Sequence, residues 1–586
     1  MSTTIQNDST EQRLRGGAIV CWRWAVLLWL VSALLLAAIN QYRNGPATLA
    51  DELGYLGIAR WLAGAGPLPN MFTAAFYHFG YSFLIAPAFW LASNPVDAYK
   101  WVMVINCILA ATVAPLSYVF ARRIFSVPNS KAVLLAVVAM LYPANAVQTN
   151  FAWSENVLPA LLLCWTILLM AAYERPTPTR LVLLALVPVA LFFAHPRMLG
   201  IELVTLAYLL AAAALTRKPN RWWYLISCSV LILAHALVAH ELTQVRHLAY
   251  ESSHGTVTNF LHVLRHVFSQ GMRLPAAASG QITYLSYGSE GLIVIGVIAL
   301  IWLSVQRYRN LRTEHSIVFS TLMNPNVILA AGIASIFAAS AITMAGGARV
   351  DHWLYGRYVD VASPILLITG TLAVLDRRQI RILAPWSVMI LCFAVTLWFT
   401  YAAITIPNGV VYNNIPTLAP LIHALQSFAG AKHIPFAVIM LLVLAPVLLW
   451  AAVGRRAAVP VIAVYLLISI ITIVEWPRYL VGHNAYPEPV KEMRAELTQM
   501  NLSDSEILVY RDAFSEPAFV AMFYRMQYFL DKNRFVVVDH PASQTCPRVG
   551  TAKDRGGATP RQAPIPLANG VTFWVPLDVS GASPCR

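Results

Sequence analysis

Long apolar runs recur along almost the whole chain and constrain its fold more than any other feature. Of the 586 residues, 58% are hydrophobic and only 12% are charged, whereas a soluble domain has roughly 25% charged residues. The runs are about 15 to 23 residues long, close to the roughly 20 residues with which a helix crosses a bilayer. Backbone groups in the hydrocarbon are satisfied only within helices or closed barrels, and runs of this length indicate helices. The sequence therefore predicts an all-α polytopic membrane bundle.

The runs predict about thirteen crossings of the membrane. The first, residues 18–39, is longer than the roughly 7 to 15 residue core of a cleaved signal peptide, so we expect a membrane helix after a cytoplasmic tail, residues 1–17. An odd number of crossings places everything from residue 476 outside the cytoplasm. The other spans are expected at residues 99–121, 132–147, 157–172, 181–194, 198–215, 223–239, 282–303, 327–344, 361–375, 382–404, 436–452 and 459–474.

The net charge of +14 is explained by topology. A protein that binds nucleic acid gathers its Lys and Arg side chains in one patch, but here they form short clusters between apolar runs. Such clusters are typical of cytoplasmic loops, and Lys100 is the clearest exception. We therefore expect a multi-pass plasma-membrane protein that binds no nucleic acid. The predicted cytoplasmic clusters are Arg122, Arg123 and Lys131; Arg175 and Arg180; Arg217, Lys218 and Arg221; Arg307, Arg309 and Arg312; Arg377, Arg378 and Arg381; Arg455 and Arg456.

The membrane domain is expected at residues 18–475 and includes a large first external loop, residues 41–98. Within that loop, residues 51–62 predict an amphipathic helix on the membrane surface, because Leu53, Leu56, Ala59 and Leu62 recur at helical spacing. The short apolar stretch 81–91 is also expected on the surface. If this stretch were counted as a membrane span, every later basic cluster would lie on the non-cytoplasmic side.

Residues 476–586 predict a small extracytoplasmic α/β domain. Strand-like patterns occupy residues 506–510, 534–539 and 571–575, and a helical pattern occupies residues 517–530. Sequence rich in Gly, Pro and Ala at residues 542–566 predicts a long loop. Cys546 and Cys585 stand alone in this tail. Outside the cytoplasm they can form one disulfide, and two free thiols are the alternative.

Two acidic groups are expected on the external face. At Asp51-Glu52, a carboxylate can act as general base toward a hydroxyl acceptor, or the acids can stabilise a helix N-terminus. Ser154-Glu155 is either a second acidic position of the same site or an N-cap with an acidic first turn.

A third group, His195-Pro196-Arg197, interrupts two apolar runs. Glu202 lies a little beyond it, inside the second run, where a carboxylate needs a partner or a wet cavity. Arg197 is the expected partner, in a functional pair or in a purely structural one.

The fourth group lies in residues 346–360, GGARVDHWLYGRYVD. The planar fork of an arginine donates two parallel hydrogen bonds to phosphate, and an aromatic neighbour can stack on a sugar. This combination favours a ligand-binding loop, although Arg and Tyr also anchor helices at membrane interfaces. The polar and aromatic residues that the loop gathers are Arg349, Asp351, His352, Arg357, Tyr358 and Asp360.

Familiar nucleotide and zinc motifs do not occur. The sequence has no GxxxxGK[ST] loop and no GxGxxG turn, and Gln244 stands where a zinc-protease motif beginning at His240-Glu241 would need its second His. We therefore predict no nucleotide site, and a sugar donor outside the cytoplasm would have to arrive attached to a lipid.

The stretch ADELGYLGIARWLAG, residues 50–64, resembles the first-loop motif of the GT-C glycosyltransferases, which use polyprenyl-phosphate-linked sugars. Protein O-mannosyltransferases, lipid A aminoarabinose transferases and actinobacterial arabinofuranosyltransferases belong to this family. The resemblance implies a membrane glycosyltransferase that moves a sugar from a polyprenyl-phosphate donor to an extracytoplasmic glycan, lipid or protein. It makes Asp51 the base that deprotonates the acceptor, with Glu52 assisting.

The same resemblance implies that Arg357 and Arg197, beside Tyr358 and His195, hold the donor phosphate during an inverting displacement at the sugar's anomeric carbon. Glu155 would be a second acidic residue. Its loop is not a clear DxD or DNE motif, so the sequence leaves open whether a divalent metal ion binds there.

Two other classes of protein remain as alternatives. A transporter or lipid flippase should contain internal repeats and helices interrupted near the midplane, and neither is evident in the sequence. A non-catalytic scaffold with an external sensing domain would leave Asp51-Glu52 and the arginine-rich loop unexplained.

Overall fold

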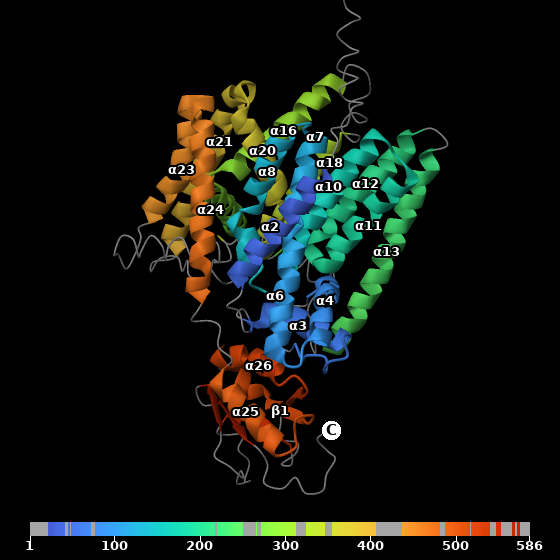
Figure 1. The fold of residues 1–586 in the computed structure, drawn as a ribbon, viewed down its shortest axis with the longest axis vertical. Coiled ribbons are helices and arrows are strands. Elements are labelled where there is room, and N and C mark those ends of the chain that lie inside the picture. Colours follow the sequence, from blue (N-terminus) through green and yellow to red (C-terminus); the bar gives the residue numbers. More distant parts are fainter. Residues whose placement is uncertain are drawn as a thin grey trace, which may run out of the picture.

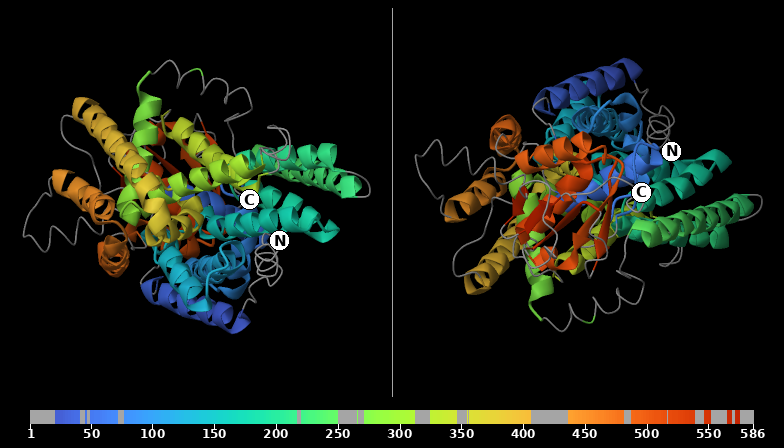
Figure 2. Two further views of the ribbon diagram at one scale, coloured as in Figure 1. Left: turned by 90° about the horizontal axis from the view of Figure 1, so that it is seen from above. Right: turned by 90° about the horizontal axis from the view of Figure 1, so that it is seen from below.

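The computed structural model describes residues 21–40, 45–46, 49–71, 77–216, 220–249, 265, 271–311, 324–345, 354, 356–405, 436–480, 487–515, 517–538, 546–551, 565–568 and 571–574. These residues form a helical bundle with a small α/β unit at one end (Figure 1). Seen from below, this unit covers the middle of that end, while the helices of residues 178–249 extend to one side of it (Figure 2).

Each predicted span coincides with a helix or with a pair of helices. Six helices in the described part of the chain are long and apolar enough to cross a membrane, or seven if one bent pair counts as a span. A helical polytopic bundle is thus confirmed, and thirteen crossings remain a prediction. The helices are α2 (Trp22–Asn40), α6 (Pro95–Ala111), α7 (Val113–Ile124), α8 (Asn129–Met140), α9 (Pro143–Gln148), α10 (Leu158–Glu174), α11 (Pro178–Ala194), α12 (Leu199–Leu215), α13 (Asn220–Ala249), α15 (Arg273–Ser289), α16 (Leu292–Leu311), α18 (Pro325–Ala345), α20 (Ser363–Leu375), α21 (Arg377–Thr405), α23 (Phe436–Val453) and α24 (Ala458–Leu480).

Three predicted spans are divided between two helices. The span expected at residues 99–121 comprises α6 and α7, which together still form one candidate span, Pro95–Ile124. The span expected at residues 282–303 is divided between α15 and α16, whose axes differ by 111°. Glu290 (φ 50°) and Gly291 (φ 79°) lie in the left-handed region at this junction, a conformation that ends a helix. The span expected at residues 132–147 is divided between α8 and α9. Pro143 disfavours helical backbone at the residue before it, and Tyr142 is accordingly extended.

The first external loop folds into short helices, α3 (Leu49–Leu62), α4 (Gly80–Ile85) and α5 (Pro87–Leu91). They lie between the bundle and the α/β unit (Figure 1). α3 is helical as predicted, and its position at the membrane surface stays a prediction, but the expected single apolar face is wrong. Leu53, Ile58 and Ala59 are all buried although they point in different directions around the helix, so protein covers more than one face of it.

Helix α26 (Pro517–Phe529) of the α/β unit supplies much of this cover. Arg60 of α3 donates a hydrogen bond of 2.9 Å to the main-chain carbonyl of Gln527. The Gln527 side chain in turn binds the backbone of Asn70 through both its amide nitrogen and its amide oxygen, and the Tyr528 hydroxyl donates to the carbonyl of Pro95 at 2.7 Å. The C-terminal unit is therefore attached directly to the helix that carries Asp51.

The α/β unit contains a five-stranded sheet with the order β2-β1-β3-β5-β4. β1 runs parallel to β2 and β3, and β5 runs antiparallel to β3 and β4. The predicted strands match β1, β2 and β5. The bounds are β1 (Glu506–Tyr510), β2 (Arg534–Val538), β3 (Arg548–Thr551), β4 (Ile565–Ala568) and β5 (Val571–Trp574).

The long loop predicted at residues 542–566 is wrong, because β3 lies within it and β4 begins at its end. The four residues of β3, RVGT, are too short and too mixed in polarity to show the alternation that marks a strand. Helix α25 (Glu488–Gln499) was not predicted. Cys546 is disulfide-bonded, and Cys585 lies outside the described residues.

Two glycines let α16 and α20 approach each other closely. A Cβ atom on Gly296 would fall on the carbonyl oxygen of Leu366, and one on Gly370 would fall on the carbonyl oxygen of Leu292. Helices in a bilayer associate through such contacts between small residues. Because α20 follows directly on the turn that carries Arg357, this packing also fixes one part of the site described below.

We expect Gly370→Val to destabilise the detergent-solubilised protein by about 1–3 kcal/mol, since a valine must push two backbones apart. Ala334→Val adds similar bulk at an exposed position of α18 and serves as the control. Size-exclusion chromatography after heating gives the melting temperature of each variant. Equal melting temperatures would contradict the close approach of α16 and α20.

Candidate active site

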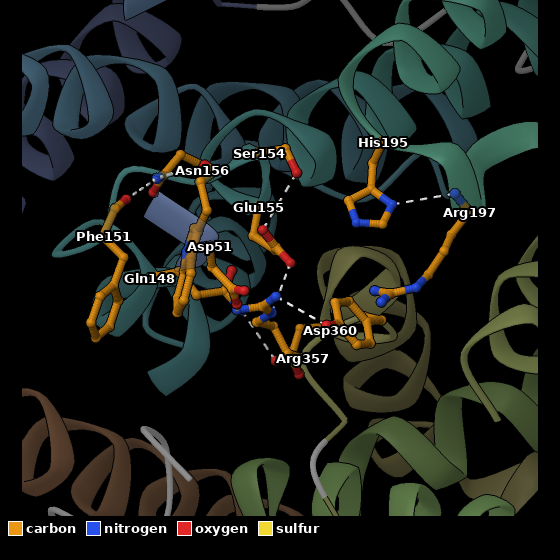
Figure 3. Close-up of polar contacts among 12 residues, drawn as sticks. Asp51, Gln148, Phe151, Ser154, Glu155, Asn156, His195, Arg197, Arg357 and Asp360 are labelled. Atoms are coloured by element: carbon orange, nitrogen blue, oxygen red, sulfur yellow. Dashed lines mark hydrogen bonds and ion pairs between the residues drawn. The ribbon is translucent and has the colours of Figure 1, made fainter. Parts of the chain in front are cut away.

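Three charged side chains from distant segments meet where α3 joins the bundle. Asp51 lies in the first turn of α3, Glu155 in the 3-10 turn η1 (Ser154–Asn156), and Arg357 in the turn before η3 (Asp360–Ala362). Arg357 bridges the two acids, with Nη1 3.1 Å from Asp51 Oδ2 and Nε 3.0 Å from Glu155 Oε1 (Figure 3). The structure therefore brings together three of the residues singled out in the sequence.

The members of this cluster differ in burial. The side chains of Arg357 and Glu155 are 7% and 3% exposed, whereas that of Asp51 is 36% exposed. A buried charge is costly unless it is paired, so Arg357 and Glu155 stabilise each other. Asp51 is the acid of the cluster that a substrate can reach.

Tyr77 caps the accessible acid. Its hydroxyl donates to Asp51 Oδ1 at 2.6 Å, and its ring lies against Gly54, where a Cβ atom would overlap the ring. A hydroxyl group thus already lies within hydrogen-bonding distance of the Asp51 oxygen that Arg357 does not contact. The sequence analysis did not identify Tyr77. The one local sign of this contact is Gly54, which lies three residues after Asp51 on the same face of the helix.

Aromatic and hydroxyl groups surround the buried pair of Arg357 and Glu155. The guanidinium carbon of Arg357 lies 4.3 Å from the ring centroid of Trp153, a cation–π contact. Ser154 Oγ donates to Glu155 Oε2 at 3.4 Å and lies 3.1 Å from the Tyr55 hydroxyl. Burial raises the pKa of Tyr55 above its usual range, so this hydroxyl stays protonated.

Glu52 points to a different side of α3 from Asp51, since successive residues of a helix lie about 100° apart. It is fully buried. Its Oε1 accepts hydrogen bonds from the Tyr99 hydroxyl at 2.6 Å and from the amide of Ala152 at 2.9 Å. Glu52 therefore ties α3 to α6 and to the segment just before η1.

Arg197 and His195 lie beside the cluster (Figure 3), and the ring of Tyr358 lies against Arg357. The Arg197 guanidinium stacks on the Tyr358 ring, and the Tyr358 hydroxyl accepts a hydrogen bond of 3.0 Å from Arg357. Whereas Arg357 faces two carboxylates, Nη1 of Arg197 is buried with no hydrogen-bond acceptor among the residues the structure describes. The site thus contains a cation whose hydrogen-bonding capacity is not fully used.

His195 is a neutral imidazole in this arrangement. Its Nδ1 accepts a hydrogen bond of 3.2 Å from the amide of Arg197, which leaves the proton on Nε2. Burial and the positive charges of Arg197 and Arg357 hold the pKa of His195 well below its usual value. Arg349, Asp351 and His352 of the same predicted polar loop as Arg357 lie outside the described residues.

Asp360 anchors the turn that carries Arg357. Its buried carboxylate accepts hydrogen bonds from the hydroxyls of Tyr142 and Tyr284, at 2.7 and 2.9 Å, and from the Gln148 amide at 3.2 Å. The sequence placed Asp360 in a polar loop without a role. Its donors lie 76 to 218 residues away along the chain, so no local pattern could reveal them.

The predicted pairing of Glu202 with Arg197 is wrong. Glu202 Oε2 lies 2.7 Å from Nδ1 of His235 on α13. This pairing arises because α12 and α13 pack side by side, a contact that spacing along one helix cannot show. Arg197 instead faces Tyr358.

The described residues contain no group of three or more His, Cys, Asp or Glu side chains that could hold a metal ion. In the cluster, the guanidinium of Arg357 supplies the positive charge between Asp51 and Glu155.

Comparison with known proteins supports the fold. No protein-family model and no curated protein matches the sequence. The crystal structure of ArnT from Cupriavidus metallidurans in the apo state matches with a TM-score of 0.50 at 13% identity, over 94% of this chain and 97% of that chain. ArnT bound to undecaprenyl phosphate matches with a TM-score of 0.48 at 13% identity, over 95% of this chain and 98% of that chain.

The archaeal oligosaccharyltransferase AglB from Archaeoglobus fulgidus, in complex with an inhibitory peptide and a dolichol-phosphate, has a TM-score of 0.41 at 10% identity, over 87% of this chain and 64% of that chain. The resemblance to GT-C proteins expected from the first-loop motif is therefore confirmed at the level of the fold by apo ArnT.

His78 supports the site from the first external loop. Its side chain is buried, and Nδ1 lies 2.7 Å from the carbonyl oxygen of Phe192, near the end of α11. Burial lowers the pKa of His78 to about 4, with the carbonyl partly opposing this shift and His235 adding to it. His195 also lies near enough to sense the charge of His78.

This shift predicts a pH-dependent stability. The folded-state pKa lies below the roughly 6.5 of an unfolded histidine, so the contribution of neutral His78 is present above pH 6.5 and is lost as the pH falls toward 4. At pH 5 the loss amounts to about 2 kcal/mol. His78→Gln keeps a donor for the Phe192 carbonyl and should flatten the decline in melting temperature between pH 7.5 and pH 5. Parallel declines in the two proteins would contradict a neutral, buried His78.

Proposed function

We propose that the protein is an inverting glycosyltransferase that moves a sugar from a polyprenyl-phosphate donor to a glycan, lipid or protein acceptor outside the cytoplasm. The observation that carries the proposal is the partly exposed carboxylate of Asp51, which is fixed by Arg357, while the ring of Tyr358 lies against both Arg357 and Arg197. Such a transfer needs a base for the acceptor hydroxyl and a cation for the leaving phosphate. The fold shared with ArnT supports the same class of reaction.

Asp51 is the proposed base. Arg357 holds Oδ2, and the hydroxyl of Tyr77 contacts Oδ1, so an acceptor hydroxyl in place of the Tyr77 hydroxyl would be oriented for deprotonation. The acceptor proton passes to Asp51 while the acceptor oxygen forms a bond to the anomeric carbon. The bond from that carbon to the phosphate oxygen breaks on the opposite side, its electron pair stays with the phosphate, and the configuration inverts.

Arg197 is the proposed phosphate-binding residue. Arg357 faces two carboxylates at 3.1 and 3.0 Å, so its charge is already balanced. Arg197 has a buried Nη1 without an acceptor in the described part of the chain, and Tyr358 holds its guanidinium in place. A phosphate oxygen would supply the missing acceptor, and negative charge develops on that phosphate as the sugar leaves.

The other predicted site residues have supporting roles in this proposal. Glu155 orients Arg357, and Glu52 fixes α3 through Tyr99 and the amide of Ala152. The proton on Nε2 of neutral His195 is available to a phosphate oxygen.

We further propose that the end of the bundle carrying the α/β unit faces away from the cytoplasm. Residues 1–17 would then be a cytoplasmic tail, residues 18–475, with the loop 41–98, the membrane domain, and residues 476–586 an extracytoplasmic domain. The basic clusters at the end of α7 and in η5 (Gly454–Ala457) lie at the opposite end of the bundle (Figure 1), which agrees with the enrichment of positive residues on the cytoplasmic side.

Asp51→Asn should lower the rate of sugar transfer by about 10²–10⁴-fold, because an amide cannot accept the proton. The measurement is transfer of radiolabelled sugar from a polyprenyl-phosphate-sugar fraction to envelope acceptors from cells without the protein. Asp97→Asn, at an exposed acid of the same external region, is the matched control. Glu52→Gln should lower the melting temperature and reduce transfer far less than Asp51→Asn. Full transfer by Asp51→Asn would exclude its assignment as the base.

Arg197→Gln should lower the maximal transfer rate by about 10²-fold and raise the Michaelis constant for the donor. Arg197→Lys keeps the charge but not the planar fork, so it should recover part of the loss. Arg123→Gln, at an exposed arginine at the other end of the bundle, is the control. Unchanged donor kinetics in Arg197→Gln would show that the phosphate binds elsewhere.

A transporter or lipid flippase is the second candidate, and the junction of α15 and α16 favours it. Interrupted helices with buried polar groups form transport sites, and Glu290 at this junction is 2% exposed, with Oε2 unpartnered among the residues described. Chromatography of the lipid after the transfer assay separates the two functions. A transferase converts the donor into free polyprenyl phosphate, whereas a flippase returns it chemically unchanged.

A further inference from the structure

A cavity of about 470 Å³ lies between helices at the end of the bundle away from the α/β unit. The turn between α7 and α8, the C-terminal parts of α16 and α20, and η5 surround it. Apolar side chains such as Phe125, Leu303 and Leu372 line it together with polar and charged ones. A second cavity of about 210 Å³ shares Phe125, Leu303 and Thr369 with the first. The two cavities are therefore neighbours that share part of their lining.

Three charged side chains line the larger cavity, Lys131, Arg455 and Asp376. Lys131 is half-buried and Arg455 is exposed. Neither cation makes an ion pair or a hydrogen bond with another residue in the described part of the chain. The lining therefore combines two cations that have no ion-pair partner among the described residues, one carboxylate and several apolar side chains.

We infer that this cavity binds the phosphate headgroup of an anionic phospholipid. Basic pockets between membrane helices on the cytoplasmic side bind such headgroups, and the volume is that of an ordinary ligand pocket. Lys131 and Arg455 would contact the phosphate diester, and the first part of an acyl chain would lie against Phe125 and Leu303.

This site is separate from the transfer site. Its elements lie at the far end of the bundle from α3 (Figure 1), and none of its lining residues belongs to the cluster around Arg357. The inference therefore does not depend on the proposed transferase activity, and its test needs no sugar donor.

The test uses the full chain, purified in a neutral detergent and supplemented with phosphatidylglycerol or with phosphatidylcholine of the same acyl chains. Native mass spectrometry counts bound lipid, and the melting temperature reports stabilisation by it. We expect phosphatidylglycerol to bind and to raise the melting temperature, and phosphatidylcholine to do neither. Lys131→Gln and Arg455→Gln should each weaken phosphatidylglycerol binding about fivefold, the effect of removing one cation near an anionic lipid.

Arg456→Gln is the matched control, because Arg456 is an exposed neighbour of Arg455 that does not line the cavity. It should leave binding unchanged. Leu303→Trp should block binding by filling the cavity while all charges stay in place. Equal binding of the two lipids, or an equal effect of Arg455→Gln and Arg456→Gln, would overturn the inference. Inorganic phosphate that matches the stabilisation by phosphatidylglycerol would also overturn it, by showing a site for a free anion.

Discussion

A single guanidinium, that of Arg357, lies between two carboxylates from segments far apart in the sequence. Arg357 and Glu155 are almost completely buried, and neither charge would be tolerated there without the other. Asp51 adds a second negative charge to the same cation, so the cluster retains a net negative charge whose exposed part is Asp51. This arrangement places a partly exposed carboxylate, held by a buried cation, where α3 joins the bundle.

The rest of the structure holds the three charged groups in place. Glu52 joins α3 to α6 and to the backbone before η1, and Arg60 joins the same helix to α26 of the C-terminal unit. Asp360 fixes the turn that carries Arg357 through two tyrosine hydroxyls and a glutamine. The C-terminal unit is thus part of the framework of the site, because α26 packs on the helix that presents Asp51.

Features that depend on a local pattern could be predicted from the sequence. Apolar run length located the membrane helices. The short apolar run of β1 and the helical pattern of α26 located those two elements. The first-loop motif pointed to Asp51 and to the fold. The breaks at Glu290 and at Pro143 were missed because apolar content alone does not show where a helix is interrupted.

Features that depend on pairing between distant segments could not be predicted. Glu202 was assigned the arginine nearest in sequence, whereas the packing of α12 on α13 gives it His235. Asp51 and Glu52 were treated as one acidic pair, whereas helix geometry turns Asp51 toward Arg357 and Glu52 into the protein.

A double-mutant cycle on Asp51→Asn and Arg357→Gln, with the free energy of unfolding measured by SDS titration in mixed micelles, tests most directly whether the two side chains share one ion cluster. A shared ion cluster predicts a coupling energy of about 1–3 kcal/mol, whereas additive effects of the two substitutions would contradict it.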